Sequence, residues 1–148
     1  MAFHFPLEAI LRLRRGQERM ERLKLEAIAS EQARAKKELE IVAEQFVGSR
    51  RSFQERMAQA TYGSELQFEN LRTDRMAAAQ NALTLRILEL EQLRRNQVAA
   101  YTKARQSREV LESLRDKKLA VYRQELLRRE QQNLDDLFLM RQNILRDE

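Results

Sequence analysis

The sequence of 148 residues contains no cysteine, no tryptophan, one proline and three glycines. Without cysteine there can be no disulfide framework and no thiolate metal site. Three glycines are too few for the turns of an all-β or α/β fold, because tight turns usually need a residue that tolerates a positive φ. No run of about 20 apolar residues occurs, so we expect no membrane-spanning helix. These absences predict an all-α protein with few loops, and we expect it in the cytoplasm.

Charged side chains and helix-forming residues dominate what is present. Charged residues make up 34% of the chain, and Leu, Arg, Glu, Ala and Gln are the commonest types. The formal charge is +5, with 22 arginines and 6 lysines, and arginine suits carboxylates and phosphates alike. The segment from Arg86 to Arg129 contains twelve basic and six acidic residues. The basic residues are distributed around the helix instead of forming one stripe. Nucleic acid is therefore a rival partner and not an expected one.

A first long helix is expected over about residues 6–61. Pro6 fits its first turn, where a missing N–H has no intrahelical partner anyway. Apolar or small residues recur about every 3.6 residues, which predicts weak winding around a partner helix. The members of this stripe are Met20, Leu23, Ala27, Ala35, Leu39, Val42, Phe46, Phe53, Met57 and Ala60.

A turn is expected at about 62–64 and a second helix over about 65–147. Gly63 suits the left-handed position after a helix end, and Ser64 with Gln67 matches a capping box. So short a loop makes the two helices antiparallel neighbours within a single hairpin domain, 1–148. The expected inward stripe of the second helix consists of Leu83, Ile87, Leu90, Leu93, Gln97, Tyr101, Ala104, Leu111, Leu114, Val121, Leu126, Leu137 and Ile144.

The two expected helices differ in length, and the second should overhang the first. With the hairpin centred near Gly63, residue n faces about residue 126 − n, so Pro6 lies opposite Ala120. The segment from Val121 onward then has nothing to pack on except the apolar amino terminus, MAFHFPLEAILRLRR. Exposed apolar surface of this extent usually marks a binding site.

Catalytic chemistry has little support in the sequence. The one histidine, His4, lies near the terminus, and the carboxylates are interleaved with arginines as in solvated ion pairs. No Gly-rich phosphate loop, HExxH motif or calcium loop is present. We therefore expect no enzyme activity, no cofactor and no metal site. Near the turn, Phe68 with Tyr62, Leu66 and Leu71 forms either a cap on the hairpin or a surface anchor.

Both ends of the chain resemble the flagellar export protein FliJ family. The opening FHFPLEAILRLRRGQERMERLKLEAI shares the phenylalanine pair and the aliphatic helix that leads into alternating charges. The later stretch LESLRDKKLAVYRQELLRREQQNLDDLFLMR resembles the family's carboxy-terminal segment, with Arg128 to Asp136 matching an R-x-E-Q-K-x-L-D-E type motif. Gln132 stands where the family usually has lysine.

The resemblance implies a long two-helix antiparallel coiled coil similar to the central stalk subunit of rotary ATPases. It implies a non-enzymatic protein of the flagellar type III export apparatus, at the cytoplasmic face of the membrane at the base of the flagellum. Its implied partners are the hexameric export ATPase, the export-gate membrane protein and export chaperones. The implied ATPase-binding residues are Phe3, Phe5, Leu7, Ile10, Leu11, Arg14, Arg129, Glu130, Gln131, Leu134, Asp135, Phe138 and Arg141. Phe68, Leu71 and Arg75 are the implied contacts to the export gate.

Three other functions stay open at this point. The chain could be the related stalk protein of a needle-type secretion system. It could be a generic coiled-coil scaffold that forms a homodimer through the overhang, or a basic helical binder of nucleic acid. A monomer that stimulates a hexameric ATPase, a tight dimer without that effect, and steeply salt-dependent DNA binding would distinguish the stalk, the scaffold and the nucleic-acid binder.

Overall fold

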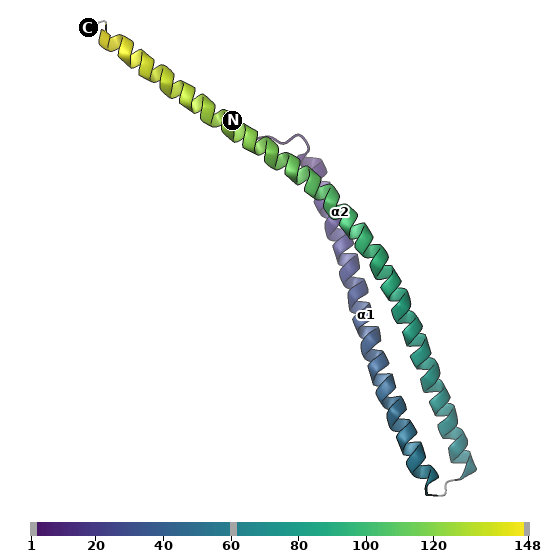
Figure 1. The fold of residues 1–148 in the computed structure, drawn as a ribbon. Helices are drawn as coiled ribbons and strands as arrows, with labels where there is room; N and C mark the ends of the chain where they lie inside the picture. The colour runs from purple at the N-terminus through teal and green to yellow at the C-terminus, as the bar shows by residue number, and fades with distance from the viewer. Residues whose placement is uncertain (1–2, 60–61, 147–148) are drawn as a thin grey trace. The chain divides into compact units, whose positions relative to one another are not determined.

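The computed structural model describes residues 3–59 and 62–146 and consists of two helices. Helix α1 spans Glu8–Met57 and helix α2 spans Gly63–Arg146 (Figure 1). The two helices pack against each other, and no strand occurs in either described range. The expected all-α helical hairpin is therefore confirmed.

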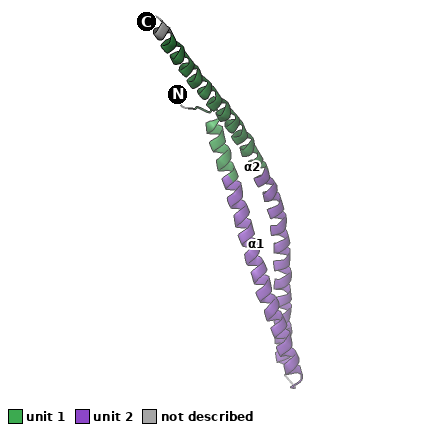
Figure 2. Cartoon of the chain, turned by 60° about the vertical axis from the view of Figure 1, so that its left-hand side comes forward, with its two compact units in different colours: residues 1–18, 103–148 green, residues 19–102 purple. Residues whose placement is uncertain are grey.

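The chain divides into two compact units (Figure 2). Unit 1 consists of Met1–Glu18 and Lys103–Glu148, and unit 2 consists of Arg19–Thr102. Within each unit a segment of α1 and a segment of α2 run side by side in opposite directions. A single domain over 1–148 stays a prediction.

Helix α1 begins two residues after the proline that was expected to start it. The Glu8 N–H donates to the Phe5 carbonyl at 3.1 Å, which closes a turn with Pro6 at its second position. Pro6 is favoured there because its φ is already set to the value that such a turn needs. The Leu11 N–H then donates to the Leu7 carbonyl at 2.9 Å, and the regular helix follows.

The turn between the helices differs from the expected one. Gly63 is the first residue of α2 and has no left-handed φ, so it does not end α1 as expected. The Tyr62 carbonyl accepts from the Glu65 N–H at 3.1 Å, which places Ser64 inside the first turn and not at the capping position. Helix α1 ends earlier, at Met57. The expected helix ends at Thr61 and Asp147 lie outside the described residues.

The inward face of α1 repeats every seven residues. From Glu18 onward, the side chains on this face that are buried or half-buried are spaced alternately three and four residues apart, which is the repeat of a left-handed coiled coil. The expected 3.6-residue step was wrong, because it followed the apolar side chains Met20 and Leu23, which are 57% and 52% exposed. Ala27 and Met57 are exposed too, and Ala60 lies outside the described residues. The buried or half-buried positions of α1 that follow the repeat are Leu11, Glu18, Glu21, Leu25, Ile28, Gln32, Ala35, Leu39, Val42, Phe46, Ser49 and Phe53.

Helix α2 has the same seven-residue repeat. The buried or half-buried positions of α2 that follow this repeat are Leu66, Glu69, Thr73, Met76, Gln80, Leu83, Ile87, Leu90, Gln97, Tyr101, Ala104, Arg108, Leu111, Arg115 and Tyr122. Several residues of the expected stripe are instead exposed, because they follow the apolar composition and not the repeat: Leu93, Leu114, Val121, Leu126 and Leu137. The Ile144 side chain lies outside the description.

The helix register matches the expectation in unit 1 and departs from it in unit 2. In unit 1 Glu18 pairs with Arg108, as the 126 − n relation requires. In unit 2 the same relation puts Arg95 opposite Glu31, whereas Glu31 pairs with Arg86. Gln97 likewise donates to the Glu21 carbonyl, whereas the relation puts residue 105 opposite Glu21.

Polar side chains occupy many positions of the inward faces. In unit 2, Leu90 and Ala35 are buried, but Gln32, Ser49 and Glu69 are buried as well. The Glu69 carboxylate accepts from Ser49 Oγ at 3.5 Å and from Arg56 Nη1 at 3.2 Å. Buried polar groups of this kind need a partner at a defined position, so they favour one register over others.

The seven-residue repeat can be tested on two nearby leucines of unit 2. Leu25 lies on the inward face and Leu23 is exposed. We expect Leu25→Ala to lower the free energy of unfolding by about 1–2 kcal/mol, because it removes apolar area from a partly buried position. Leu23→Ala should change it by less than about 0.5 kcal/mol. Urea unfolding followed by far-UV circular dichroism measures both, and a larger loss for Leu23→Ala than for Leu25→Ala would support the 3.6-residue phase.

Candidate functional site

The amino-terminal residues 3–7, here called the N-terminal arm, fold against α2 within unit 1. Phe5 is 3% exposed, and its ring lies 6.0 Å from Lys118 Nζ, at the limit of a cation–π contact. The ring of Phe3 lies 5.6 Å from that of Tyr122, with the two planes inclined by 51°. Such tilted aromatic pairs are attractive beyond their buried area. The two phenylalanines therefore hold the arm on α2.

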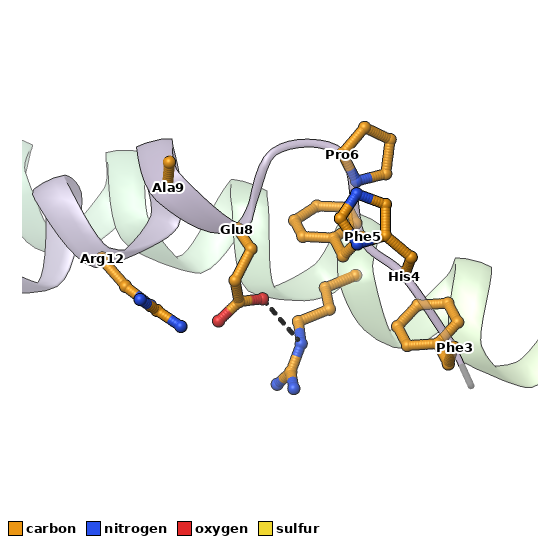
Figure 3. A pocket seen from close by; sticks show the side chains of 8 residues that line it. Phe3, His4, Phe5, Pro6, Glu8, Ala9 and Arg12 are labelled. Atoms are coloured by element: carbon orange, nitrogen blue, oxygen red, sulfur yellow. Dashed lines mark ion pairs between the residues drawn. The ribbon is translucent and has the colours of Figure 1, made fainter.

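The arm borders a hollow of about 500 Å³ on unit 1 (Figure 3). Glu8, the first residue of α1, points toward this hollow and forms an ion pair with Arg115 of α2, at 3.4 Å between Oε2 and Nε. The residues that line the hollow are Phe3, His4, Phe5, Pro6, Glu8, Ala9, Arg12 and Arg115.

Four charged side chains connect α1 to α2 next to the arm. Arg15 donates to Glu112 at 3.0 Å, and Arg108 donates to both Glu18 and Glu112. The hydrogen bond that Arg108 donates to Glu18 is the main reason why the pKa of Arg108 is raised, although burial acts in the opposite direction. Burial alone would raise the pKa of Glu112, but the hydrogen bond from Arg15 and the charges of Arg108 and Arg15 outweigh it, so this pKa is lowered. Both shifts favour the charged forms of Arg108 and Glu112, and the four side chains together hold the register of unit 1.

Helix α2 continues past the arm as a stretch with no covering helix in unit 1. We call residues 123–142 the α2 tail; every side chain in this range is exposed. Leu134 and Phe138 are 66% and 63% exposed. At 100° per residue, most of the large apolar side chains fall on one broad side of the helix. They are Leu126, Leu127, Leu134, Leu137, Phe138 and Met140, while Leu139 points away from this side.

The structure separates the residues of the expected ATPase-binding set by exposure. Phe5 and Leu11 are buried inside unit 1, and Leu11 is fully inaccessible. Phe3 and Leu7 are partly buried, whereas Ile10 and Arg14 are exposed. The members on the α2 tail, from Arg129 to Arg141, are all exposed.

The contacts of the arm reach only the beginning of the overhang. They end at Lys118 and Tyr122, at least seven residues before Arg129. The arm thus covers the root of the overhang and leaves the face of the α2 tail open. The sequence did not predict the contact between Phe3 and Tyr122. The seven-residue repeat on α2 is the signal that would have indicated Tyr122 as an inward position.

A second exposed patch lies on unit 2, soon after the turn. Phe68 is 65% exposed, and Leu71 and Arg75 are exposed on the same side of α2, three and seven residues further on. Of the two interpretations of Phe68, the exposure favours a surface anchor over a cap packed inside the hairpin. Leu66, two residues earlier, occupies the inward position.

Features of other site classes do not occur in the described part of the chain. Within residues 3–59 and 62–146, no group of three or more His, Asp and Glu side chains is arranged to hold a metal ion. Neither helix, over the same residues, has a segment both long and apolar enough to cross a membrane.

The ion network of unit 1 predicts a pH dependence of stability. Because the pKa of Glu112 is lowered in the folded state, its contribution to stability is present above the pKa of an unfolded glutamate and is lost as the pH falls through the folded value. We expect Glu112→Gln to lower the melting temperature at neutral pH and to make little difference in acid below the folded pKa. Thermal melts across this range measure the effect. Glu125→Gln, at an exposed carboxylate of the same helix, serves as the control, and a difference that persists in acid would contradict the prediction.

Comparison with known proteins identifies the family. The model of the family described as "FliJ: Flagellar FliJ protein" matches residues 3–146, which include both helices, the N-terminal arm and the α2 tail. Searches of curated proteins and of solved structures gave no match. The family match agrees with the resemblance seen at the two ends of the sequence, and it covers nearly the whole chain. This two-helix chain therefore belongs to the flagellar FliJ protein family.

Proposed function

We propose that this chain is a non-enzymatic stalk component of the flagellar type III export apparatus that binds and stimulates the hexameric export ATPase. The observation that carries the proposal is the open apolar face of the α2 tail in a member of the FliJ family. A slim helix whose end keeps its apolar side chains in solvent is suited to enter a ring of subunits. Inside the ring, these side chains would be buried and would contribute binding energy.

The exposed residues of the set are the proposed contacts to the ring. Leu134 and Phe138 supply apolar area, and Arg129, Glu130 and Arg141 supply charges that select and orient the partner. Phe5 and Leu11 have a different proposed role, since both are buried in unit 1. They stabilise the packing of unit 1, Phe5 from the N-terminal arm and Leu11 from α1. Phe3 of the arm, together with Ile10 and Arg14 of α1, has surface available for a partner.

The remaining partners of the proposal are the export gate and the export chaperones. Phe68, Leu71 and Arg75 present an aromatic, an aliphatic and a cationic group side by side on unit 2, a combination that is enriched in protein interfaces. We assign the gate contact to this patch. The proposed location is the cytoplasmic face of the membrane at the base of the flagellum.

Removal of the α2 tail is the first test of ATPase binding. A chain that ends after Ala120 should lose stimulation of the export ATPase and keep most of its helicity, because α1 and its facing segment of α2 are retained. This truncation also removes Tyr122, on which Phe3 packs. Point variants are therefore needed to separate loss of the tail surface from loss of the arm.

Three leucine and phenylalanine positions provide these variants. Leu134→Asp and Phe138→Asp should each raise the concentration for half-maximal ATPase stimulation about tenfold or more, the cost of losing one buried apolar side chain. Leu139→Asp makes the same chemical change on the other side of the tail and should stimulate like the original protein. Circular dichroism checks that all three remain helical. Equal stimulation by all three would refute a ring contact at this face.

The proposed gate contact is tested in the same way. Phe68→Ala should weaken binding to the soluble part of the export-gate protein about tenfold, because an exposed aromatic anchor is removed. Leu88→Ala changes an exposed leucine of unit 2 that lies off the patch and should bind normally. Binding can be measured by interferometry with the immobilised chain. A normal affinity of Phe68→Ala would contradict the assignment of the gate contact to this patch.

A further inference from the structure

Three charges of the α2 tail, those of Arg123, Glu130 and Arg141, lie on the centre line of its open face. Glu130 and Arg141 are eleven residues apart, which is close to three helical turns, so both point to the same side of the helix. Leu126 and Leu137 lie on one flank of this line, and the other flank holds Leu127, Leu134 and Phe138. From Leu126 onward the face therefore has an acid near one end, a base near the other and apolar side chains between and beside them.

We infer that a second copy of this chain covers the face, in an antiparallel pair with its twofold axis between Asp135 and Asp136. In this arrangement Glu130 of each copy lies opposite Arg141 of the other, and symmetry forms the pair twice. Leu134 lies opposite Leu137 at the centre. A parallel pair in register would instead place each glutamate against a glutamate and each arginine against an arginine. Charge complementarity thus favours a second copy of the chain as the partner and the antiparallel over the parallel orientation.

The other charges of the tail do not oppose this pairing. Glu125, Arg128, Arg129, Asp135 and Asp136 fall more than 90° away from the centre line of the face, so they remain in solvent in the pair. Arg123 lies on the centre line but precedes the paired length, which begins at Leu126. The paired length, residues 126–145, is about 30 Å at about 1.5 Å per residue. An interface of one helix stripe over this length is small, so the dimer is reversible and depends on concentration.

The pair also regulates the site assigned above, a consequence that rests on the proposed function. Leu134 and Phe138 cannot contact a second copy and an ATPase ring at the same time. Free chain would protect its apolar face by pairing, and the ring would compete for the face when it is present. The two complexes therefore exclude each other.

Charge reversal in the full chain tests the pair. In sedimentation velocity, the apparent mass of the original protein should rise from the 17.6 kDa of one chain toward twice that value as its concentration increases. Glu130→Arg and Arg141→Glu should each remain monomeric, because each places like charges opposite one another. An equimolar mixture of the two variants should form dimers again, since every opposed pair is then of unlike charge. Arg128→Glu carries the same charge change as Arg141→Glu on the far side of the helix and should dimerise normally.

Two results would overturn the pair. One is an original protein that stays at 17.6 kDa throughout, and the other is a mixture of variants that stays monomeric. Failure here is separable from failure of the proposed function. A monomeric chain whose ATPase stimulation is lost in Leu134→Asp refutes the pair and supports the ring contact, whereas a dimer that does not stimulate the ATPase does the reverse.

Discussion

Two packed helices bury only the stripe of side chains that lies between them, and every other face of both helices meets solvent. In this chain the consequence is visible in the burial pattern, since few large side chains are buried and Leu11 and Leu90 are the most enclosed of those described. The stripe itself carries glutamates, glutamines and arginines at core positions, and their partners hold the register. Stability is thus spread along a thin seam, and apolar residues off the seam are available for binding.

The same constraint accounts for the two open faces on which the proposals rest. The α2 tail is the proposed surface for a ring or a second copy, and the Phe68 patch on unit 2 is the proposed surface for the export gate. Among the described residues, nothing in its own unit covers either face, so neither requires a conformational change to become accessible. The proposed competition for the tail therefore needs no second conformation.

The sequence predicted much of this architecture, and its errors have a physical cause. The two helices and the apolar overhang follow from the shortage of glycine and proline and from the unequal distances to the turn. The helical phase was wrong at Met20 and Leu23, because the true seam passes through polar residues such as Glu21 and Gln32 and counting of apolar residues avoids these. The register in unit 2 was wrong because counting from Gly63 assigns one register to the whole hairpin, whereas the observed ion pairs follow that register at Glu18 and not at Glu31.

For the candidate site, the sequence by itself determined the family, the chemical nature of both ends and the presence of an uncovered apolar segment. These properties follow from composition and local order along one helix. Only the tertiary structure decided which residues of that set are accessible. The resemblance implied that Phe5 and Leu11 contact the ATPase, but both are buried in unit 1, since burial depends on the neighbouring helix. Phe3 packs on Tyr122, more than a hundred residues away in the sequence. Exposure is a property of the packed pair of helices, and no single segment of the chain contains it.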